Sequence, residues 1–202
     1  MLNYASVLGS IGTGMGLIRA VPQLVRLLRA RAAYGVSLDS AATSSIVSFG
    51  WVAYALMTHQ VYVILATGAS GLIFALVAIF AVRYGRRLNE FKVAPLWFVV
   101  LLLSGVLIGK NGLGIMLPVS VLAANIPQLW VAYKEGNLID LSLGTWALSM
   151  TDGLIWGVYA LLQHDIPILG YGIFQLITSG MIVLIKLLHS AREKNQPSGA
   201  GS

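Results

Sequence analysis

The segments Trp51-Val52-Ala53-Tyr54-Ala55-Leu56 and Trp156-Gly157-Val158-Tyr159-Ala160-Leu161 share a Trp-x-x-Tyr-Ala-Leu pattern. The second segment begins 105 residues after the first, at position 156 instead of 51. The same offset, without any gap, relates further identical residues on both sides: Pro22-Gln23-Leu24 to Pro127-Gln128-Leu129, Ser37-Leu38 to Ser142-Leu143, and His59 to His164. Shared apolar composition would rarely match residues as uncommon as Trp, Tyr, Pro and Gln. The pattern therefore indicates an internal duplication.

The composition is typical of an integral membrane protein. Of 202 residues, 57% are hydrophobic and only 10% are charged, too few to give a soluble domain of this size a polar surface. The chain has no cysteine, which excludes disulfides and thiolate metal sites, and its three histidines lack metal-ligand spacing. We therefore expect neither a metal nor a cofactor.

Seven apolar segments follow one another along the chain. They cover residues 4–28, 41–58, 62–84, 94–109, 113–133, 141–162 and 166–188. Most have the roughly 17 to 25 residues that a helix needs to cross the ~30 Å hydrocarbon layer of a bilayer. The segment 94–109 is the shortest. The sequence thus predicts an all-α membrane protein with seven transmembrane helices.

The net charge of +6 is explained by where the basic residues lie. They lie at the ends of, or just after, the first, third, fifth and seventh segments: Arg26, Arg29, Arg31, Arg83, Arg86, Arg87, Lys92, Lys134, Lys186, Arg192 and Lys194. Only Lys110 falls in a loop on the opposite side of the membrane. Cytoplasmic loops are enriched in Lys and Arg, so the amino terminus is predicted outside and the carboxyl terminus in the cytoplasm, in the plasma or inner membrane. The first segment lacks a preceding basic stretch and a small-residue cleavage site, and we interpret it as a mature helix and not as a signal peptide.

The duplication and the number of segments together predict the domain organisation. Each repeat has three segments, so the second copy would be inverted unless one further segment lay between the copies. We expect a first three-helix repeat over 1–90, a linker helix over 91–111, a second repeat over 112–190 and a flexible cytoplasmic tail over 191–202. Two parallel three-helix bundles, joined by the linker helix, would then enclose a site near the membrane midplane.

These elements resemble the PQ-loop superfamily. Its pattern is a Pro-Gln near the cytoplasmic end of the first helix of each bundle, here Pro22-Gln23 and Pro127-Gln128, followed by Trp-x-x-Tyr in the second helix. Within the superfamily, the seven-segment arrangement is most similar to the SWEET sugar transporters. The resemblance covers nearly the whole chain and implies a membrane transporter for a small sugar.

The two Pro-Gln pairs are candidate hinges. A proline inside a helix removes one backbone hydrogen bond and loosens the helix locally, and Gln23 and Gln128 can bond to the carbonyls that are freed. A bend at Pro22 or Pro127 would move the cytoplasmic mouth of the pathway. The alternative is a static kink that serves only helix packing.

The two tryptophans are candidate substrate-binding residues. The resemblance implies that Trp51 and Trp156 face each other and stack on the sugar ring, for which an indole supplies a flat apolar surface. The alternative is a place in the aromatic belt at the membrane interface.

The family's asparagine, sixteen residues after each tryptophan, is replaced in this chain. The corresponding residues are Thr67 and Gly172. A threonine offers fewer hydrogen bonds than a carboxamide and a glycine offers only space, so Gln175, one turn after Gly172, is a candidate replacement. Tyr171 and Ser70 are weaker candidates.

Asp152 lies near the middle of the sixth segment, one helical turn before Trp156. Acidic residues inside a membrane are costly and are therefore functional candidates. Asp152 could accept hydrogen bonds from sugar hydroxyls, or it could bind and release a proton during transport, as suggested by the intramembrane aspartates of cystinosin-like relatives. Arg19 either neutralises Asp152 or extends to the cytoplasmic surface.

No enzyme active site is indicated, because the sequence lacks a Ser-His-Asp set at membrane depth and a phosphate-binding glycine loop. The prediction from sequence is uniport of a mono- or disaccharide by alternating access. The alternatives are proton-coupled transport of an amino acid or similar solute, and a non-transporting cargo receptor. The expected partners are the small solute and membrane lipids, with no nucleic acid; assembly into homo-oligomers is left open.

Overall fold

The computed structural model of the chain describes residues 4–34, 36–135 and 143–195. Within them the chain is all α-helical apart from short connections and one 3-10 turn, which confirms the predicted fold class. The elements are α1 (Tyr4–Ala30), α2 (Leu38–Met57), α3 (Val61–Arg83), η1 (Leu88–Glu90), α4 (Ala94–Ile108), α5 (Lys110–Glu135), α6 (Leu143–Gln163) and α7 (Ile166–Asn195). Each predicted apolar segment forms one helix, and α7 continues beyond the apolar stretch that ends at position 188.

Local sequence signals explain where several helices begin. The Ser37 hydroxyl accepts a hydrogen bond from the backbone N–H of Ser40 at 3.2 Å and caps α2. The Asp165 carboxyl does the same for α7, accepting from the N–H of Ile168 at 2.9 Å. Pro95 occupies the first turn of α4, where a missing N–H costs no helix bond.

The seven helices of the described residues differ in how apolar they are. Three of them are long and apolar enough to cross a membrane by length and composition: Leu38–Met57, Val61–Arg83 and Ile166–Leu188. The helix Ala94–Ile108 is apolar but shorter. The helices α1, α5 and α6 contain Arg19, Asn125 and Asp152 respectively, and these polar side chains lower their hydropathy. Large apolar side chains lie exposed on the outer surface, which fits a protein embedded in lipid.

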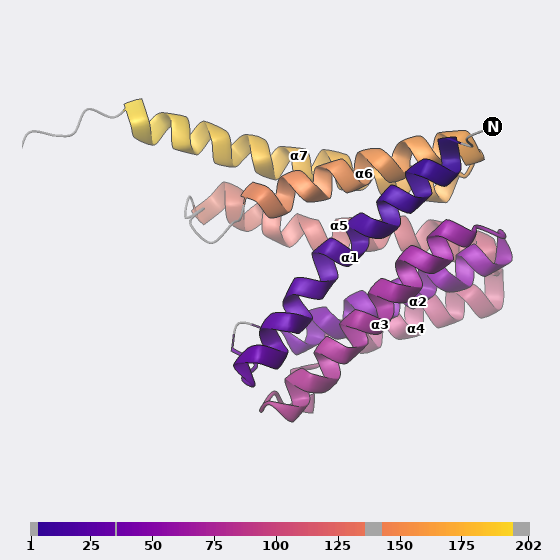
Figure 1. Cartoon of the computed structure of the whole chain (residues 1–202), viewed down its shortest axis with the longest axis horizontal. Coiled ribbons are helices and arrows are strands. Elements are labelled where there is room, and N and C mark those ends of the chain that lie inside the picture. Colours follow the sequence, from indigo (N-terminus) through magenta and orange to yellow (C-terminus); the bar gives the residue numbers. More distant parts are fainter. Residues whose placement is uncertain (1–3, 35, 136–142, 196–202) are drawn as a thin grey trace, which may run out of the picture.

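The two copies of the duplicated sequence fold in the same way. In the first bundle (α1, α2 and α3), α1 packs on α3 and α3 packs on α2; in the second bundle (α5, α6 and α7), α5 packs on α7 and α7 packs on α6. The bundles meet where α1 packs on α6 and α2 packs on α5, while α4 packs on α2 and α5. Figure 1 shows the bundles close together at one end and separated at the other, with α1 crossing between them.

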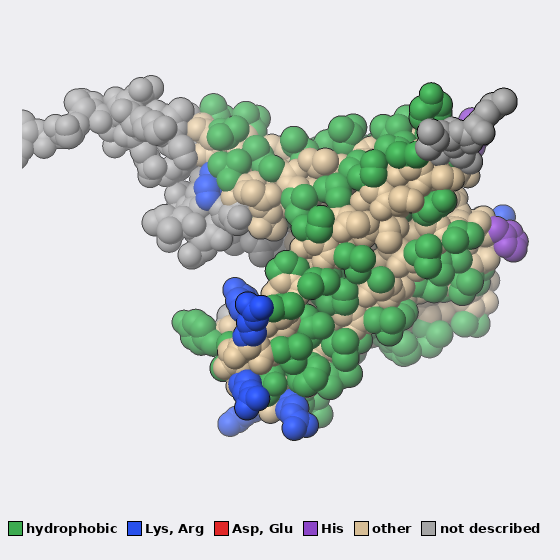
Figure 2. Space-filling model, viewed as in Figure 1, with side chains coloured by type: hydrophobic (Ala, Val, Ile, Leu, Met, Phe, Trp, Pro, Cys, Tyr) green, Lys and Arg blue, Asp and Glu red, His purple; other side chains and the backbone are tan. Residues whose placement is uncertain are grey.

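The two ends of the molecule carry different residues (Figure 2). At the basic end, Arg26 and Arg29 lie near the end of α1, and Arg83, Arg86 and Arg87 lie at and after the end of α3. At the histidine end, His59 and His164 occupy the short turns between α2 and α3 and between α6 and α7, with φ angles of 58° and 54°. The shared left-handed conformation means that the duplication extends to the shape of these turns.

The linker helix α4 is fixed to the first bundle at the basic end. The carboxyl of Asp39, in the first turn of α2, accepts hydrogen bonds from the backbone N–H groups of Lys92, Val93 and Ala94 at 2.9 to 3.0 Å. These donors are the groups that the start of a helix leaves without partners, so Asp39 holds the start of α4 against α2.

Candidate functional site

A cavity of about 390 Å³ lies between the two bundles. All six helices of the bundles contribute residues to its lining, and no residue of α4 is among the described ones. The volume lies within the roughly 300 to 1,000 Å³ range of small-molecule sites. The substrate-binding candidates from the sequence that line this cavity are Trp51, Thr67, Ser70, Asp152, Trp156, Tyr171 and Gln175.

Trp51 and Trp156 are both buried, with 6% and 7% of their surface exposed. Neither therefore lies at the outer surface, where a residue of an interfacial aromatic belt would be. The ring of Trp51 meets that of Tyr171 from the other bundle edge-to-face, with centroids 5.7 Å apart. Trp156 packs edge-to-face on Tyr159, at 5.3 Å. The two indoles are thus held by neighbouring aromatic rings at matching positions of the cavity.

Arg19 and Asp152 form an ion pair between the two bundles. The Nη1 atom of Arg19 on α1 lies 3.0 Å from Oδ2 of Asp152 on α6. The hydroxyl of Tyr171 donates a second hydrogen bond to the same oxygen, at 2.7 Å. The side chain of Asp152 is only 3% exposed, whereas that of Arg19 is 33% exposed. Of the two sequence alternatives for Arg19, neutralisation of Asp152 is the observed one.

Gln175 belongs to a polar cluster that the sequence did not predict in full. Asn125 on α5 donates to Oε1 of Gln175 at 3.2 Å and to the hydroxyl of Thr178 at 2.7 Å. The amide of Gln175 in turn donates to the hydroxyl of Ser179 at 3.2 Å. Asn125 is buried and lines the cavity, and its position two residues before Pro127, inside an apolar segment, was the signal that could have identified it.

Gly172 and Thr67 differ in their surroundings, although both take the place of the family's asparagine. Thr67 lines the cavity, and its hydroxyl donates to the carbonyl of Val63 in its own helix. Gly172 lies instead against α6, where a Cβ atom would come within 2.7 Å of backbone atoms of Gly153 and Gly157. Its role in this structure is close packing of α7 on α6, which corrects the prediction that it faces a ligand.

The candidate hinge residues lie outside the described lining of the cavity. Pro22 and Gln23 lie within α1, which continues without interruption to Ala30. Pro127 and Gln128 lie within α5, and their side chains are outside the described part of the structure.

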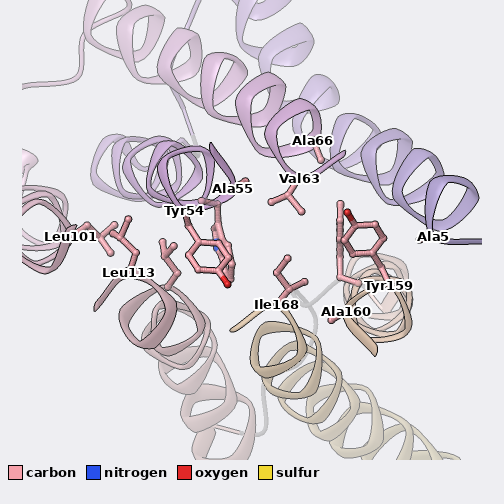
Figure 3. Packing of buried hydrophobic residues seen from close by; sticks show 13 residues of the cluster. Ala5, Tyr54, Ala55, Val63, Ala66, Leu101, Leu113, Tyr159, Ala160 and Ile168 are labelled. Atoms are coloured by element: carbon pink, nitrogen blue, oxygen red, sulfur yellow. The ribbon is translucent and has the colours of Figure 1, made fainter. Parts of the chain in front are cut away.

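Two layers of matching residues close the cavity at the histidine end. The first layer is apolar: Val63 and its counterpart Ile168 are both buried and line the cavity. In Figure 3 they lie between Tyr54 on one side and Tyr159 on the other.

The second layer is a buried hydrogen-bond network that joins the bundles. Gln60 and Asp165, which are related by the duplication, bond to each other through Nε2 and Oδ2 at 2.9 Å. The hydroxyl of Tyr54 donates to Oδ2 of Asp165 at 2.8 Å, and the hydroxyl of Tyr159 donates to Oε1 of Gln60 at 2.8 Å. Each bundle thus supplies one tyrosine to the partner residue of the other. We call these four residues the clasp.

In the other direction the cavity extends toward the basic end. Its lining there includes Thr43 and Ser44 of α2 and Thr145 and Trp146 of α6, all within about two turns of the helix starts at that end. The bundles diverge toward the same end (Figure 1). The arrangement is therefore a cavity between two similar bundles, closed at the histidine end.

This architecture has a match among solved structures. The chain aligns with a 3.7 Å structure of a eukaryotic SWEET transporter over 93% of its own length and 97% of that chain, with a TM-score of 0.74. The fold is that of a SWEET transporter. Sequence identity in the alignment is 13%, so the likeness lies in the backbone and not in the side chains. Comparison of the sequence with family models and with curated proteins gave no match.

Proposed function

We propose that this chain is an alternating-access membrane transporter that carries a mono- or disaccharide by facilitated diffusion. The observation that carries the proposal is the cavity between two duplicated bundles, lined by paired tryptophans and closed at the histidine end by the clasp. Opening the clasp while the basic end closes would expose the same residues to the other side of the membrane. The basic end is proposed to face the cytoplasm, because its Arg residues follow the positive-inside rule.

Uptake by proteoliposomes tests this function directly. The purified chain is reconstituted in liposomes, and uptake of a panel of labelled mono- and disaccharides is measured without any ion gradient. We expect at least one sugar to equilibrate across the membrane, with many sugar molecules moved per protein. Saturation at one sugar molecule per protein would identify a receptor, and the absence of uptake for the whole panel would reject sugar transport.

The tryptophan pair is expected to supply much of the binding energy. Replacing Trp51 or Trp156 with Ala removes a buried aromatic face from the cavity, and each change should weaken sugar binding by roughly 1 to 3 kcal/mol. Titration calorimetry with a transported sugar measures the loss. Trp97→Ala on α4, outside the described cavity lining, is the matched control and should bind normally. Normal binding by both cavity variants would reject the stacking of the sugar on Trp51 and Trp156.

The hinge hypothesis predicts a loss of rate without a loss of fold. In Pro22→Ala the restored backbone hydrogen bond stiffens α1, so transport should become much slower while the unfolding temperature is kept or raised. Pro95→Ala serves as the control, because Pro95 lies in a first helix turn where it interrupts no helix bond. Equal transport rates in Pro22→Ala and the unmodified protein would reject the hinge role of Pro22.

A proton-coupled mechanism is the second candidate, and the buried carboxyl of Asp152 is the observation that favours it. Asn at position 152 keeps an acceptor oxygen but cannot titrate. In a uniporter, Asp152→Asn should retain measurable flux that does not depend on a pH gradient. In a proton-coupled transporter, the unmodified protein would concentrate its solute under a pH gradient, and the variant would lose this uptake while keeping exchange of preloaded solute. Measuring both modes in the same vesicles separates the two mechanisms.

A further inference from the structure

The two walls of the cavity are related by the duplication but differ in charge. Trp51 matches Trp156 and Ser44 matches Ser149, so part of the lining is the same on both sides. The charged wall consists of Arg19, Asp152 and Tyr171, and the residues at the matching positions are, in the same order, Ala124, Val47 and Ala66. All six line the cavity. A solute in this cavity therefore meets a charged wall on one side and an apolar wall on the other.

The accessible charge on the charged wall is positive. Asp152 is 3% exposed, and both Arg19 and Tyr171 bond to its Oδ2 atom. Arg19 keeps one third of its side chain exposed. Among the described lining residues, Arg19 and Asp152 are the only charged ones; the others are apolar or carry hydroxyl, amide or indole groups. The charge that a solute can reach is thus the guanidinium group.

A guanidinium group matches a carboxylate better than a sugar hydroxyl. It has five N–H donors in a planar fork, and the pair with Asp152 engages the Nη1 end. A carboxylate can accept two parallel hydrogen bonds from such a fork, and these charge-assisted bonds are roughly twice as strong as neutral ones. Because the low dielectric inside the membrane domain strengthens such bonds, the difference between an acid and its neutral analogue should be large in this cavity.

We propose that the solute bound in this cavity carries a carboxylate that pairs with Arg19, on a hydroxylated body that packs between Trp51 and Trp156. The class that fits is a sugar acid such as a hexuronate. This inference rests on the proposed transport function and specifies its substrate. The difference between the walls fixes the orientation of the solute, with its carboxylate toward α1 and its C–H groups toward Ala124 and Val47.

Solute pairs that differ in a single carboxylate test the inference. The probes are D-glucuronate and D-glucose, D-galacturonate and D-galactose, and the non-sugar pair lactate and 1,2-propanediol. Binding to the purified full chain is measured by calorimetry, and uptake by proteoliposomes. We expect the acid of at least one sugar pair to bind at least tenfold more tightly than its neutral partner and to be transported.

Three variants assign the preference to Arg19. The double variant Arg19→Gln/Asp152→Asn removes both charges without leaving a buried carboxylate unpaired. The ratio of the dissociation constant of the neutral solute to that of its acid should then be close to one. Arg19→Lys keeps the charge but not the planar fork, so its ratio of dissociation constants should lie between one and the ratio of the unmodified protein. If the double variant does not fold, this lowered ratio in Arg19→Lys tests the role of Arg19 by itself. Arg83→Gln, at the end of α3 and outside the described lining, should leave the ratio unchanged.

The outcomes separate this inference from the proposed function. Transport of neutral sugars without a preference for their acids would overturn the carboxylate inference and leave sugar transport intact. Binding of lactate alone, dependent on Arg19, would support carboxylate recognition and overturn the sugar assignment. A preference for acids that persists in the double variant, or binding of none of the six probes, would overturn the role given to Arg19.

Discussion

Replacing Asp165 with alanine is expected to open the histidine end of the protein. The carboxyl of Asp165 accepts hydrogen bonds from Tyr54 and Gln60 of the first bundle and from the backbone N–H of Ile168. Two of the three bonds join the bundles, and each is worth about 1 kcal/mol or more. Since about 1.4 kcal/mol corresponds to a factor of ten in a population, the open state should become at least tenfold more populated.

Cysteine labelling measures this change, because the chain has no cysteine of its own. A single cysteine is introduced as Ser70→Cys in the cavity lining, and the rate of its reaction with a membrane-impermeant maleimide is measured from the histidine end in oriented vesicles. Asp165→Ala should raise the rate at least tenfold, and Tyr159→Phe, which removes one bond of the clasp, should raise it less.

The matched control for Asp165→Ala is Asp39→Ala. Asp39 also holds the start of a helix through backbone hydrogen bonds, but at the basic end. Its replacement should leave labelling from the histidine end unchanged. If Asp165→Ala and Asp39→Ala label at the same rate as the unmodified protein, the clasp does not keep this end closed.

Gly172→Ala is expected to destabilise the fold, although it adds a single methyl group. The new Cβ atom would lie 2.7 Å from the carbonyl oxygen of Gly153 and from the Cα and N atoms of Gly157. These are backbone atoms, which cannot rotate away as a flexible side chain can, so α6 and α7 would have to separate. Overpacking of this kind costs typically about 1 to 3 kcal/mol and sometimes more.

Gly14→Ala is the control for the same substitution. Among the described residues, nothing apart from the adjoining backbone of α1 itself lies within 4 Å of the position where its Cβ would be, in the middle of α1. Alanine is favoured over glycine in a helix by roughly 0.5 to 1 kcal/mol, so Gly14→Ala should raise the unfolding temperature in detergent while Gly172→Ala lowers it. Equal effects of the two variants would contradict the close packing of α7 on α6.

The larger substitution Gly172→Asn, which restores the residue type of the SWEET pattern, should lower the unfolding temperature further than Gly172→Ala does.

Part of the candidate site could be predicted from particular residues. Trp51 and Trp156 were named because the duplication repeats them in register and the family resemblance implies that they stack on a sugar. Asp152 was named because an acidic side chain inside an apolar segment is costly without a partner. Arg19 could be named as that partner, but the sequence did not decide between the ion pair and the membrane surface. The choice depends on α1 packing against α6, a contact between segments more than a hundred residues apart.

Other residues could not be predicted, and each for a physical reason. Gly172 was assigned to the cavity by counting from Trp156, but counting along the chain does not fix which side of α7 faces α6. Asn125 has no counterpart in the first copy, where Ala20 occupies its position, so the duplication gave no signal. Gln60 and Asp165 differ in type and lie in short turns, and only the meeting of the two bundles makes them bond to each other.

The sequence by itself determined the all-α fold class and the seven helices of the described residues, and it predicted the repetition of three helices around a linker. These follow from local hydrophobicity and from the duplication, both of which are read along the chain. The tertiary structure decided which end of the cavity is closed, which helix face each lining residue occupies, and that the accessible charge belongs to Arg19 and not to Asp152. Those properties depend on how two similar bundles pack against each other, and the packing brings together side chains whose distance in the sequence says nothing about their distance in space.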